Sequence, residues 1–518
     1  MFISAILVGV LVCWASPALA ETIADTAWVR TYNGLGNSTD EAYALAVDYS
    51  GNVYVTGGSY GSGTGPDYVT IKYYSNGDTA WVRRYGGPGT YEDIGYAIDV
   101  DDSLNVYVTG WSKGGGYHTD YATVKYYPNG DTAWVRRYNG PGNDDDLAYV
   151  IVVDGLGNVC VTGESYGSGT DKDYATIKYL PNGDTAWVRR YNGLGSSYDA
   201  AYDMAVDDSG NVYVTGESGG SWDLRDYATI KYYPNGDTAW VRTYNGPANS
   251  LDYASAIAVD GSGNVYVTGG SYGTGTTYSD YATIKYLPNG DTAWVRRYSG
   301  LGSSYDAAYD MAVDDSGNVY VTGKSIGSGT DYDYATIKYY PDGDTAWVRR
   351  YTGPGDPFYE ADLATSIAVD DSGNVYVTGW SQASGSGFDY TTIKYFPNGD
   401  TAWVIRYNGP GNSTDIANAI ATDGSGSVYV TGISYGTGTD YDYATIKYVQ
   451  FLRGDANRDG LVDVEDVIYL IHYLYMNGPC PVPVLQVVDV NCDGVIDLGD
   501  VLYLINYLLK DGPPPCGR

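Results

Sequence analysis

The sequence is poor in basic residues and in long apolar runs. Lysine and arginine number 29 against 63 aspartates and glutamates, which gives a formal net charge of −34. Such an acidic chain repels phosphate backbones and anionic lipids, so nucleic acid is not expected as a partner. Apart from residues 2–14, no apolar run approaches the roughly eighteen residues that span a bilayer. We therefore expect no membrane span in the mature protein.

Catalytic signatures are also missing. There are two histidines, His118 in a glycine-rich stretch and His472 in a predicted helix. The chain contains no Gly-x-Ser-x-Gly elbow, no HExxH helix and no glycine-rich phosphate loop. Paired carboxylates of a glycosidase stay open, because spacing in sequence does not fix their separation in space. No motif points to an enzyme.

Residues 1–20 are typical of a secretory signal peptide. The apolar run of residues 2–14 is followed by the small-x-small cleavage site Ala18-Leu19-Ala20. Cleavage there predicts a secreted protein, located outside the cell or at its surface.

Four cysteines remain after this cleavage. Cys160 replaces a tyrosine of a repeated strand, so we expect a packed thiol there. Export permits one disulfide among Cys480, Cys492 and Cys516, and three pairings are open.

Internal repetition dominates the chain. The string DTAW begins at Asp25, Asp78, Asp131, Asp184, Asp237, Asp291, Asp344 and Asp400. Each unit, about 53 residues long, holds four alternating, β-branched and aromatic segments: DTAWVRRY, AYxxAVD, NVYVTG and DYATIKY. The connectors DSGN and PNGD supply the Asn and Gly of tight hairpins. Eight units of four antiparallel strands predict a mainly β fold, an eight-bladed β-propeller over residues 25–448.

The order of the segments predicts how the ring closes. If the AVD segment is the innermost strand of a blade, the DTAWVRRY segment is the outermost. The first DTAW strand then comes before any inner strand of its own blade, and the last repeat lacks an outer strand. Residues 25–32 can then complete the last blade and remove two exposed sheet edges. An open solenoid is the alternative.

The strings GNVYVTG and DYATIKY resemble the SBBP family of propeller repeats. This resemblance covers roughly residues 25–448. The family is associated with seven blades, whereas eight copies are present here.

Variation among the repeats falls on one face of the predicted propeller. The DSGN and PNGD connectors share one face and are nearly constant, whereas both connectors of the opposite face vary. Exposed tryptophans there could stack on sugar rings or anchor a protein. Drift in surface loops and packing over the blade edge are the alternatives. The candidate ligand residues of this variable face are Trp111, Glu164, Glu217, Trp222, Lys324 and Trp380.

Charged residues also recur in every repeat. Examples are Asp67, Lys72 and Arg83. A single active site should break the symmetry of the repeats, and these residues keep it. We expect inter-strand ion pairs and turn ligands.

Two calcium-loop motifs follow the repeats, at residues 455–466 and 489–500. Calcium takes six to eight oxygen ligands, which a twelve-residue loop supplies from positions 1, 3, 5, 7, 9 and 12, with glycine at position 6. Gly460 and Gly494 occupy that sixth position. Two calcium ions are expected, bound by Asp455, Asn457, Asp459, the Leu461 carbonyl, Asp463, Asp466, Asp489, Asn491, Asp493, the Val495 carbonyl, Asp497 and Asp500.

Each loop leads into an amphipathic helix. Residues with helical spacing are Val467, Ile468, Ile471 and Leu474, then Val501, Leu502, Ile505 and Leu508. Gly-Pro pairs at 478–479 and 512–513 end both helices. Loop–helix duplicates with Asp at position 12 resemble type I dockerins, over about residues 452–518.

The dockerin resemblance implies calcium-dependent folding and binding to a cohesin module of a scaffoldin or cell-surface protein. In this family, partner recognition involves loop positions 10 and 11 and the following helix. The residues at these positions here are not the Ser/Thr pairs and basic residues of cellulosomal dockerins. The candidate docking residues are Val464, Glu465, Ile471, His472, Leu498, Gly499, Ile505 and Asn506.

Together these features predict a secreted, non-catalytic propeller that binds or displays a carbohydrate or protein ligand and is attached through a calcium-binding domain. One alternative is a component enzyme of extracellular polysaccharide degradation, with a hydrolase or lyase site on the propeller face. The other is a structural cell-surface protein.

Overall fold

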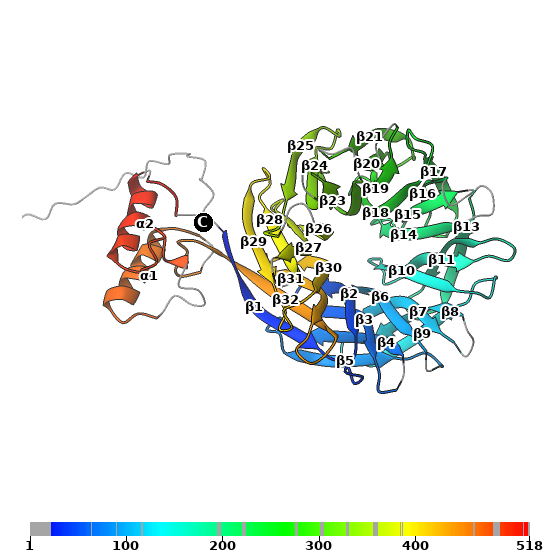
Figure 1. Cartoon of the computed structure of the whole chain (residues 1–518), viewed down its shortest axis with the longest axis horizontal. Helices are drawn as coiled ribbons and strands as arrows, with labels where there is room; N and C mark the ends of the chain where they lie inside the picture. Colours follow the sequence, from blue (N-terminus) through cyan, green and yellow to red (C-terminus); the bar gives the residue numbers. More distant parts are fainter. Residues whose placement is uncertain are drawn as a thin grey trace, which may run out of the picture. The chain divides into compact units, whose positions relative to one another are not determined.

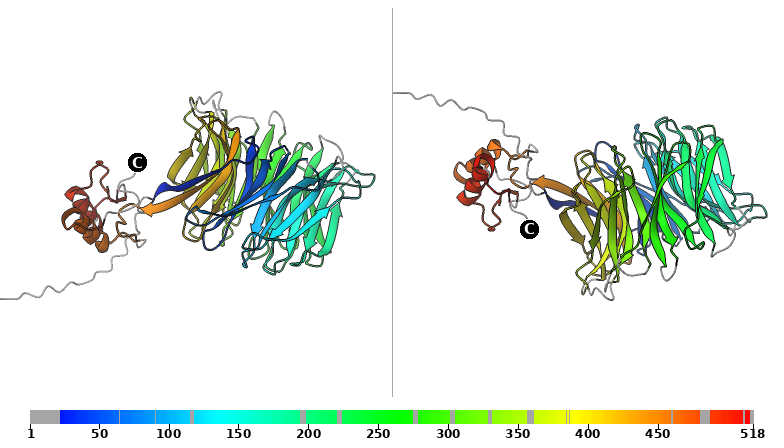
Figure 2. Two further views of the ribbon diagram at one scale, coloured as in Figure 1. Left: turned by 90° about the horizontal axis from the view of Figure 1, so that it is seen from below. Right: turned by 90° about the horizontal axis from the view of Figure 1, so that it is seen from above.

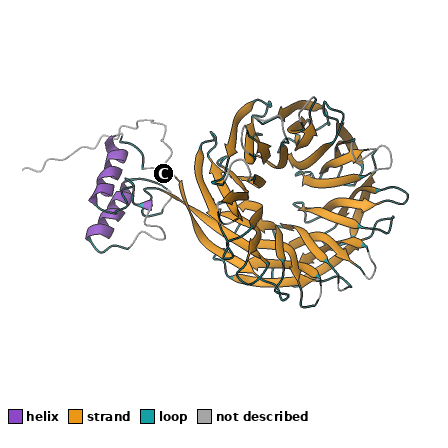
Figure 3. Ribbon diagram, in the orientation of Figure 1, coloured by secondary structure: helices purple, strands orange, loops and turns teal. Residues whose placement is uncertain are grey.

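A computed structural model describes residues 22–515, apart from 64, 90, 115–117, 194–197, 220–223, 275–277, 301–304, 328–330, 356–360, 384, 386, 459–460, 480–486 and 511. The chain forms two compact units. One spans Thr26–Val449, and the other comprises Gln450–Arg518 together with the residues before Thr26. Strands make up the first unit and helices dominate the second (Figure 3).

The first unit is an eight-bladed β-propeller, as the repeats predict (Figure 1). Each blade is a four-stranded antiparallel sheet. The innermost strands, which surround the propeller axis, are β2 (Asp40–Val47), β6 (Asp93–Val100), β10 (Asp146–Val153), β14 (Asp199–Val206), β18 (Asp252–Val259), β22 (Ala307–Val313), β26 (Asp362–Val369) and β30 (Asp415–Thr422).

The second strands carry the NVYVTG motif. They are β3 (Val53–Tyr60), β7 (Val106–Lys113), β11 (Val159–Tyr166), β15 (Val212–Gly219), β19 (Val265–Tyr272), β23 (Val319–Ile326), β27 (Val375–Ala383) and β31 (Val428–Tyr435). The third strands are β4 (Pro66–Tyr73), β8 (Thr119–Tyr126), β12 (Lys172–Tyr179), β16 (Arg225–Tyr232), β20 (Ser279–Tyr286), β24 (Tyr332–Tyr339), β28 (Gly387–Tyr395) and β32 (Tyr441–Leu452).

The outermost strands carry DTAW. They are β1 (Thr22–Tyr32), β5 (Thr79–Tyr85), β9 (Thr132–Tyr138), β13 (Thr185–Tyr191), β17 (Thr238–Tyr244), β21 (Thr292–Tyr298), β25 (Thr345–Tyr351) and β29 (Thr401–Tyr407). The blades stand side by side as stacked sheets when the ring is seen from its edge (Figure 2).

The N-terminal strand closes the ring. The eighth sheet has the order β1-β32-β31-β30, so β1 supplies the outer strand that the last repeat lacks. Trp28 of β1 is buried between Tyr73 of blade 1 and Tyr429 of blade 8. The predicted closure is confirmed, and the open solenoid is excluded.

Buried tyrosines join neighbouring blades. The Tyr68 hydroxyl donates to the Ala122 carbonyl of the next blade at 2.9 Å. Equivalent bonds run around the ring to Tyr443, whose hydroxyl donates to Val69 of blade 1 at 3.4 Å. Since a buried hydroxyl without a partner destabilises the fold, these bonds explain why large polar rings can fill the core between blades.

The recurring charged residues hold strands and blades together. Arg84 pairs with Asp67 of the neighbouring strand at 3.0 Å, and five other blades repeat this pair. Arg83 instead lies over Trp81 and donates Nε to the Gly130 carbonyl in a turn of the next blade at 2.5 Å. The expected ion pair of Asp67 and turn contact of Arg83 are confirmed, whereas Lys72 forms no ion pair with the described residues and lies over the Tyr54 ring at 4.9 Å.

Cys160 is the packed thiol that the sequence predicts. It is a free, fully buried cysteine. Elsewhere a tyrosine at this position donates to a turn aspartate, as Tyr107 does to Asp101 at 2.8 Å. In the Cys160 blade, Lys178 pairs with that aspartate, Asp154, at 3.0 Å.

The second unit contains helices α1 (Val464–Tyr475) and α2 (Leu498–Lys510). Its core is formed by Ala456, Val467, Leu470, Val488, Val490, Val501 and Leu504. Cys492 is disulfide-bonded, while Cys480 and Cys516 lie outside the described residues, so the pairing stays open. Among the described residues, no helix has the length and apolar character needed to cross a membrane.

Candidate functional site

Buried aspartates anchor the variable loops of the propeller. Each inner strand begins at, or directly after, one of them, and in every blade its carboxylate accepts from a loop glycine, as Asp146 does from Gly140 N at 2.6 Å. Burial raises their pKa values, in Asp199 to about 6. These aspartates are not among the predicted site residues, although one recurs at the same place in every repeat: Asp40, Asp93, Asp146, Asp199, Asp252, Asp306, Asp362 and Asp415.

Two of the candidate ligand residues on the variable face belong to one buried network. Glu164 and Glu217 are both almost fully buried. Lys172 pairs with Glu164, and Arg225 pairs with Glu217. Both carboxylates are therefore neutralised inside the protein and are not free ligand contacts.

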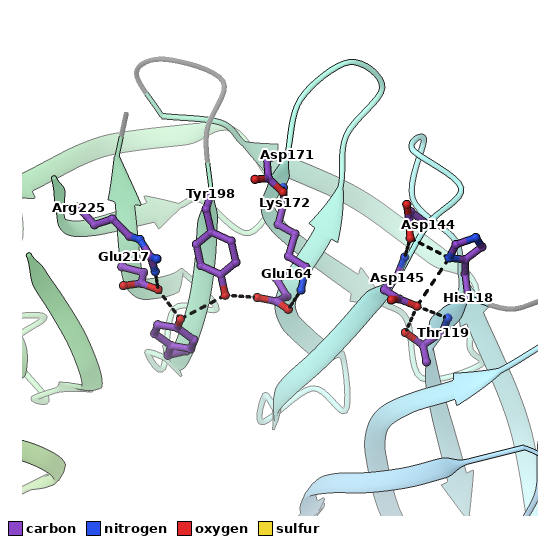
Figure 4. A network of polar contacts seen from close by, with 11 residues as sticks. His118, Thr119, Asp144, Asp145, Glu164, Asp171, Lys172, Tyr198, Glu217 and Arg225 are labelled. Atoms are coloured by element: carbon purple, nitrogen blue, oxygen red, sulfur yellow. Dashed lines mark hydrogen bonds and ion pairs between the residues drawn. The ribbon is translucent and has the colours of Figure 1, made fainter. Parts of the chain in front are cut away.

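Two tyrosines connect these carboxylates (Figure 4). The Tyr198 hydroxyl donates to Glu164 at 2.5 Å, and Tyr202 donates to Glu217 at 2.6 Å. The two hydroxyls lie 3.5 Å apart. Burial and the neighbouring carboxylates raise the pKa of both tyrosines well above the ordinary value.

The other candidates of the variable face have separate surroundings. The Lys324 ammonium lies over the rings of Tyr305, Tyr309 and Tyr332, at 4.8, 5.8 and 4.4 Å, and burial lowers its pKa. Trp380 packs 4.4 Å from the Phe388 ring. Trp111 is half-buried, and Trp222 lies outside the described residues.

A histidine also lies at the rim of this face. His118 Nδ1 is 2.7 Å from Asp144 Oδ1 and 3.9 Å from Asp145 Oδ1 (Figure 4). Asp145 in turn accepts from the Thr119 main-chain N–H at 2.8 Å. Both carboxylates thus hold the loop end that carries this imidazole.

In the second unit, Asp466 folds the first calcium-loop motif onto helix α1. Its Oδ1 accepts from Ala456 N at 2.8 Å and from Asn457 N at 3.1 Å. Its Oδ2 accepts from Asp463 N at 2.8 Å, while Asp463 caps the helix by accepting from Glu465 N at 2.7 Å. The twelfth loop position therefore holds the main chain of the second, third and ninth positions around it.

The second motif repeats this arrangement. Asp500 Oδ1 accepts from Val490 N at 2.9 Å and from Asn491 N at 3.3 Å, and its Oδ2 accepts from Asp497 N at 3.0 Å. Gly494 N donates to Asp489 at 3.1 Å, and its φ of +84° is the left-handed conformation that favours glycine. Two loops with one geometry explain the 34-residue repeat.

The electrostatics of both loops suit a cation. Asp466 is fully buried, and burial together with the Asp455 charge raises its pKa to about 6. The same causes, with Asp489 as the neighbour, raise the pKa of Asp500. Facing carboxylates with further oxygen donors are the set that calcium prefers. The described residues fit this ion, and Asp459 lies outside them.

Most candidate docking residues lie on the outer faces of the helices. Val464 and Leu498 are half exposed, Glu465, His472 and Asn506 are exposed, and Ile471, Gly499 and Ile505 are half-buried. Two further residues join this outer surface. Ile468 and Leu502 belong to the apolar stripe that helical spacing predicts, yet they are 51% and 57% exposed. Like Val464 and Leu498, they lie 34 residues apart, and this spacing is the sequence signal that relates them.

Comparison with known families identifies the second unit. Residues 453–509 match the model of the Dockerin type I domain. The C-terminal unit is a type I dockerin domain. Dockerin domains of this type bind calcium, which agrees with the oxygen-bearing side chains of the two loops. They also dock onto cohesins.

The propeller matches a repeat family. Residues 80–118, 186–221, 293–329 and 346–385 each match the SBBP Beta-propeller repeat model. The chain thus joins SBBP propeller repeats to the dockerin, and the resemblance predicted for both parts is confirmed. No curated protein matches the chain.

Solved structures show only distant similarity. The β-propeller domain of the Trilobed protease from Pyrococcus furiosus is 10% identical, with 68% of this chain and 93% of that chain covered and a TM-score of 0.38. Regucalcin from Agrobacterium tumefaciens, described as a calcium-binding protein, is 11% identical, with coverages of 54% and 81% and a TM-score of 0.29. A protein of unknown function from Dyadobacter fermentans is 10% identical, with coverages of 57% and 93% and a TM-score of 0.36.

Proposed function

We propose that the protein is a secreted, non-catalytic β-propeller binding module that a calcium-loaded dockerin attaches to a cohesin on another extracellular or cell-surface protein. The observation that carries this proposal is the duplicated acidic loop in which Asp466 and Asp500 each accept hydrogen bonds from main-chain N–H groups of their own loop, in the first turn of the helix that follows. The signal peptide predicted at residues 1–20 supports export.

The proposal includes two calcium ions, one for each loop. The ligands would be those that the loop positions predict, with Leu461 and Val495 contributing main-chain carbonyls. Bound calcium would offset the repulsion between Asp455 and Asp466 in the first loop and between Asp489 and Asp500 in the second. Asp466 and Asp500 hold the loop main chain and lie in the first turns of the helices, so ion binding and helix formation should be coupled.

The docking surface would use the outer faces of both helices. Ile468 and Leu502 extend the candidate surface that Val464 and Leu498 begin, and all four are about half exposed. Exposed apolar side chains related by an internal repeat are typical of a protein-binding surface. A cohesin is the partner that the domain type favours.

The Glu164–Glu217 network bears on the choice between binding and catalysis. A glycosidase needs two carboxyl groups that face its substrate. Both glutamates here are almost fully buried, and each pairs with a cation of the protein. This arrangement supports a binding role over hydrolysis at this pair.

Surface plasmon resonance on a panel of immobilised type I cohesin modules tests the proposal. The full chain should bind at least one module in calcium and none in EGTA. The I468D/L502D variant should weaken binding at least about tenfold, because both side chains would lose apolar contact. Leu156→Asp, at a propeller residue that is 83% exposed, is the control. Lack of binding by protein whose helices form in calcium would overturn the proposal.

A further inference from the structure

Every innermost strand of the propeller bulges at the same place. In each blade, the residue of the innermost strand that lies three positions after the buried loop-anchoring aspartate has no partner in the second strand. In β2, for example, Ala42 and Ala44 pair with Gly57 and Thr56, and Tyr43 between them is skipped. A β-bulge re-aims the side chain of its extra residue, and bulges are frequent next to binding sites. The eight bulged residues are Tyr43, Tyr96, Tyr149, Tyr202, Ser255, Tyr309, Thr365 and Asn418.

These side chains share one chemical property. All eight are uncharged, and all carry a hydroxyl or an amide that can form hydrogen bonds. Their identity varies around the ring, whereas the anchoring aspartates are the same in every blade. The bulge therefore occurs in every blade, whereas the side chain at the bulge differs between blades.

Four of the tyrosines form a continuous arc over blades 1 to 4. The Tyr43 and Tyr96 rings stack at 5.0 Å, Tyr96 meets Tyr149 at 5.7 Å, and Tyr149 meets Tyr202 at 6.1 Å. Tyr96 is 39% exposed, and the other three are half-buried. Tyr198 extends the arc, since its hydroxyl lies 3.5 Å from that of Tyr202.

The other half of the ring differs. Thr365 donates to the Ala417 carbonyl and Asn418 to the Ala42 carbonyl, both at 2.8 Å, so these short side chains link neighbouring blades. Tyr309 lies beneath the Lys324 ammonium. Among the bulged residues, a continuous run of tyrosines is thus confined to blades 1 to 4, which a purely structural ring of equal blades would not require.

The glutamates beside the arc already have partners inside the protein. In the strand pairs just before the bulges they are Glu41, Glu164 and Glu217. Lys172 and Arg225 neutralise Glu164 and Glu217 and are engaged by the same pairs. Glu41 accepts a hydrogen bond from Tyr43.

Acidic residues directly after two bulges are also engaged. Asp203 accepts from Ile257 N at 2.7 Å, and Asp310 accepts from Ile367 N at 2.9 Å, each in the next blade. Burial raises the pKa of both, in Asp203 to about 7. These carboxylates join blades and are not spare anionic contacts.

We propose that the tyrosine arc formed by Tyr43, Tyr96, Tyr149 and Tyr202 binds a neutral oligosaccharide segment. Aromatic faces stack on the C–H faces of sugar rings, and the phenol hydroxyls can bond to sugar hydroxyls. The ion-paired glutamates and the uncharged bulge side chains favour an uncharged polyhydroxylated ligand over a polyanion or a basic peptide. This inference rests on the proposed role of the propeller as a binding module.

Native affinity electrophoresis of the full chain in calcium tests it. The gels contain hydroxyethyl cellulose, xylan, galactomannan or soluble starch, with carboxymethyl cellulose as the anionic counterpart of the first polymer. At least one neutral polymer should retard the protein, and carboxymethyl cellulose should retard it less than hydroxyethyl cellulose. Tyr96→Ala should weaken retardation about tenfold, and Tyr96→Phe should keep most of it, because the ring provides the stacking surface.

Tyr127→Ala is the matched control. Tyr127 is 50% exposed in a turn of the constant face, so its removal should leave retardation unchanged. Absence of retardation in all four neutral gels would overturn the inference, as would a Tyr96→Ala variant that binds like the parent. Preferred binding to carboxymethyl cellulose or to a basic peptide would overturn it as well. Cohesin binding of the same preparations separates these results from a failure of the attachment role, which would abolish that binding instead.

Discussion

Replacement of Trp28 in the N-terminal strand tests whether β1 is an integral part of the eighth blade. Trp28 is 7% exposed, contacts Tyr73 and Tyr429 at 6.0 and 6.3 Å, and donates to the Ser75 carbonyl at 3.2 Å. Trp240 in β17 is its counterpart inside the chain. It is 8% exposed, contacts Tyr286 and Tyr213 at 6.0 and 6.3 Å, and donates to a carbonyl at 3.2 Å.

Because the two surroundings match, Trp28→Ala and Trp240→Ala should destabilise the propeller equally. Loss of a buried tryptophan costs about 3–5 kcal/mol. For a cooperative unit of this size, the entropy of unfolding converts that loss into a fall in Tm of about 4 °C. Calorimetry in saturating calcium measures the shift, with Tyr127→Ala as the exposed control. A Trp28→Ala variant that melts like the parent, beside a destabilised Trp240→Ala variant, would refute closure by β1.

Three further predictions concern pH, a buried thiol and the dockerin loops. Burial raises the pKa values of Asp199 to about 6 and of Asp203 to about 7, above the ordinary 3.8. The folded state therefore binds protons more tightly than the unfolded state, and the free energy of unfolding falls as pH rises through this window. Tryptophan fluorescence, which reports the propeller because residues 450–518 contain no tryptophan, should give a higher Tm at pH 5 than at pH 7.5; an equal or lower value would contradict it. Cys160 is fully buried and burial raises its pKa to about 12, so the native protein should react with Ellman's reagent no faster than Cys160→Ala until urea is added. Asp500→Ala should weaken calcium binding at one of two sites at least about tenfold by calorimetry, whereas Asn506→Ala should not.

The repeats made most of the fold predictable. Eight copies with an unpaired first strand indicate eight blades and their closure, because blade geometry follows from local alternation and turn residues. The bulges could not be predicted in this way. A bulged residue such as Tyr96 shifts the alternation by one, and nothing in its neighbours' identity marks the shift.

The candidate ligand residues show a second limit. Glu164 and Glu217 stand out in the sequence because they break the repeat. Lys172 and Arg225, each eight residues further along, reach back across the hairpin and neutralise them. Only the folded pairing of β11 with β12 and of β15 with β16 reveals this. Similarly, helical spacing alone did not separate exposed Ile468 from buried Val467, because the apolar stripe is wider than the buried face.

Calcium titration of residues 450–518 tests the central claim most directly. These residues contain the whole dockerin core and both loops. Far-UV circular dichroism combined with titration calorimetry should show helix formation coupled to the binding of two calcium ions per chain, reversed by EGTA. A segment whose helix content does not respond to calcium, or that binds none, would contradict the account of a calcium-dependent dockerin.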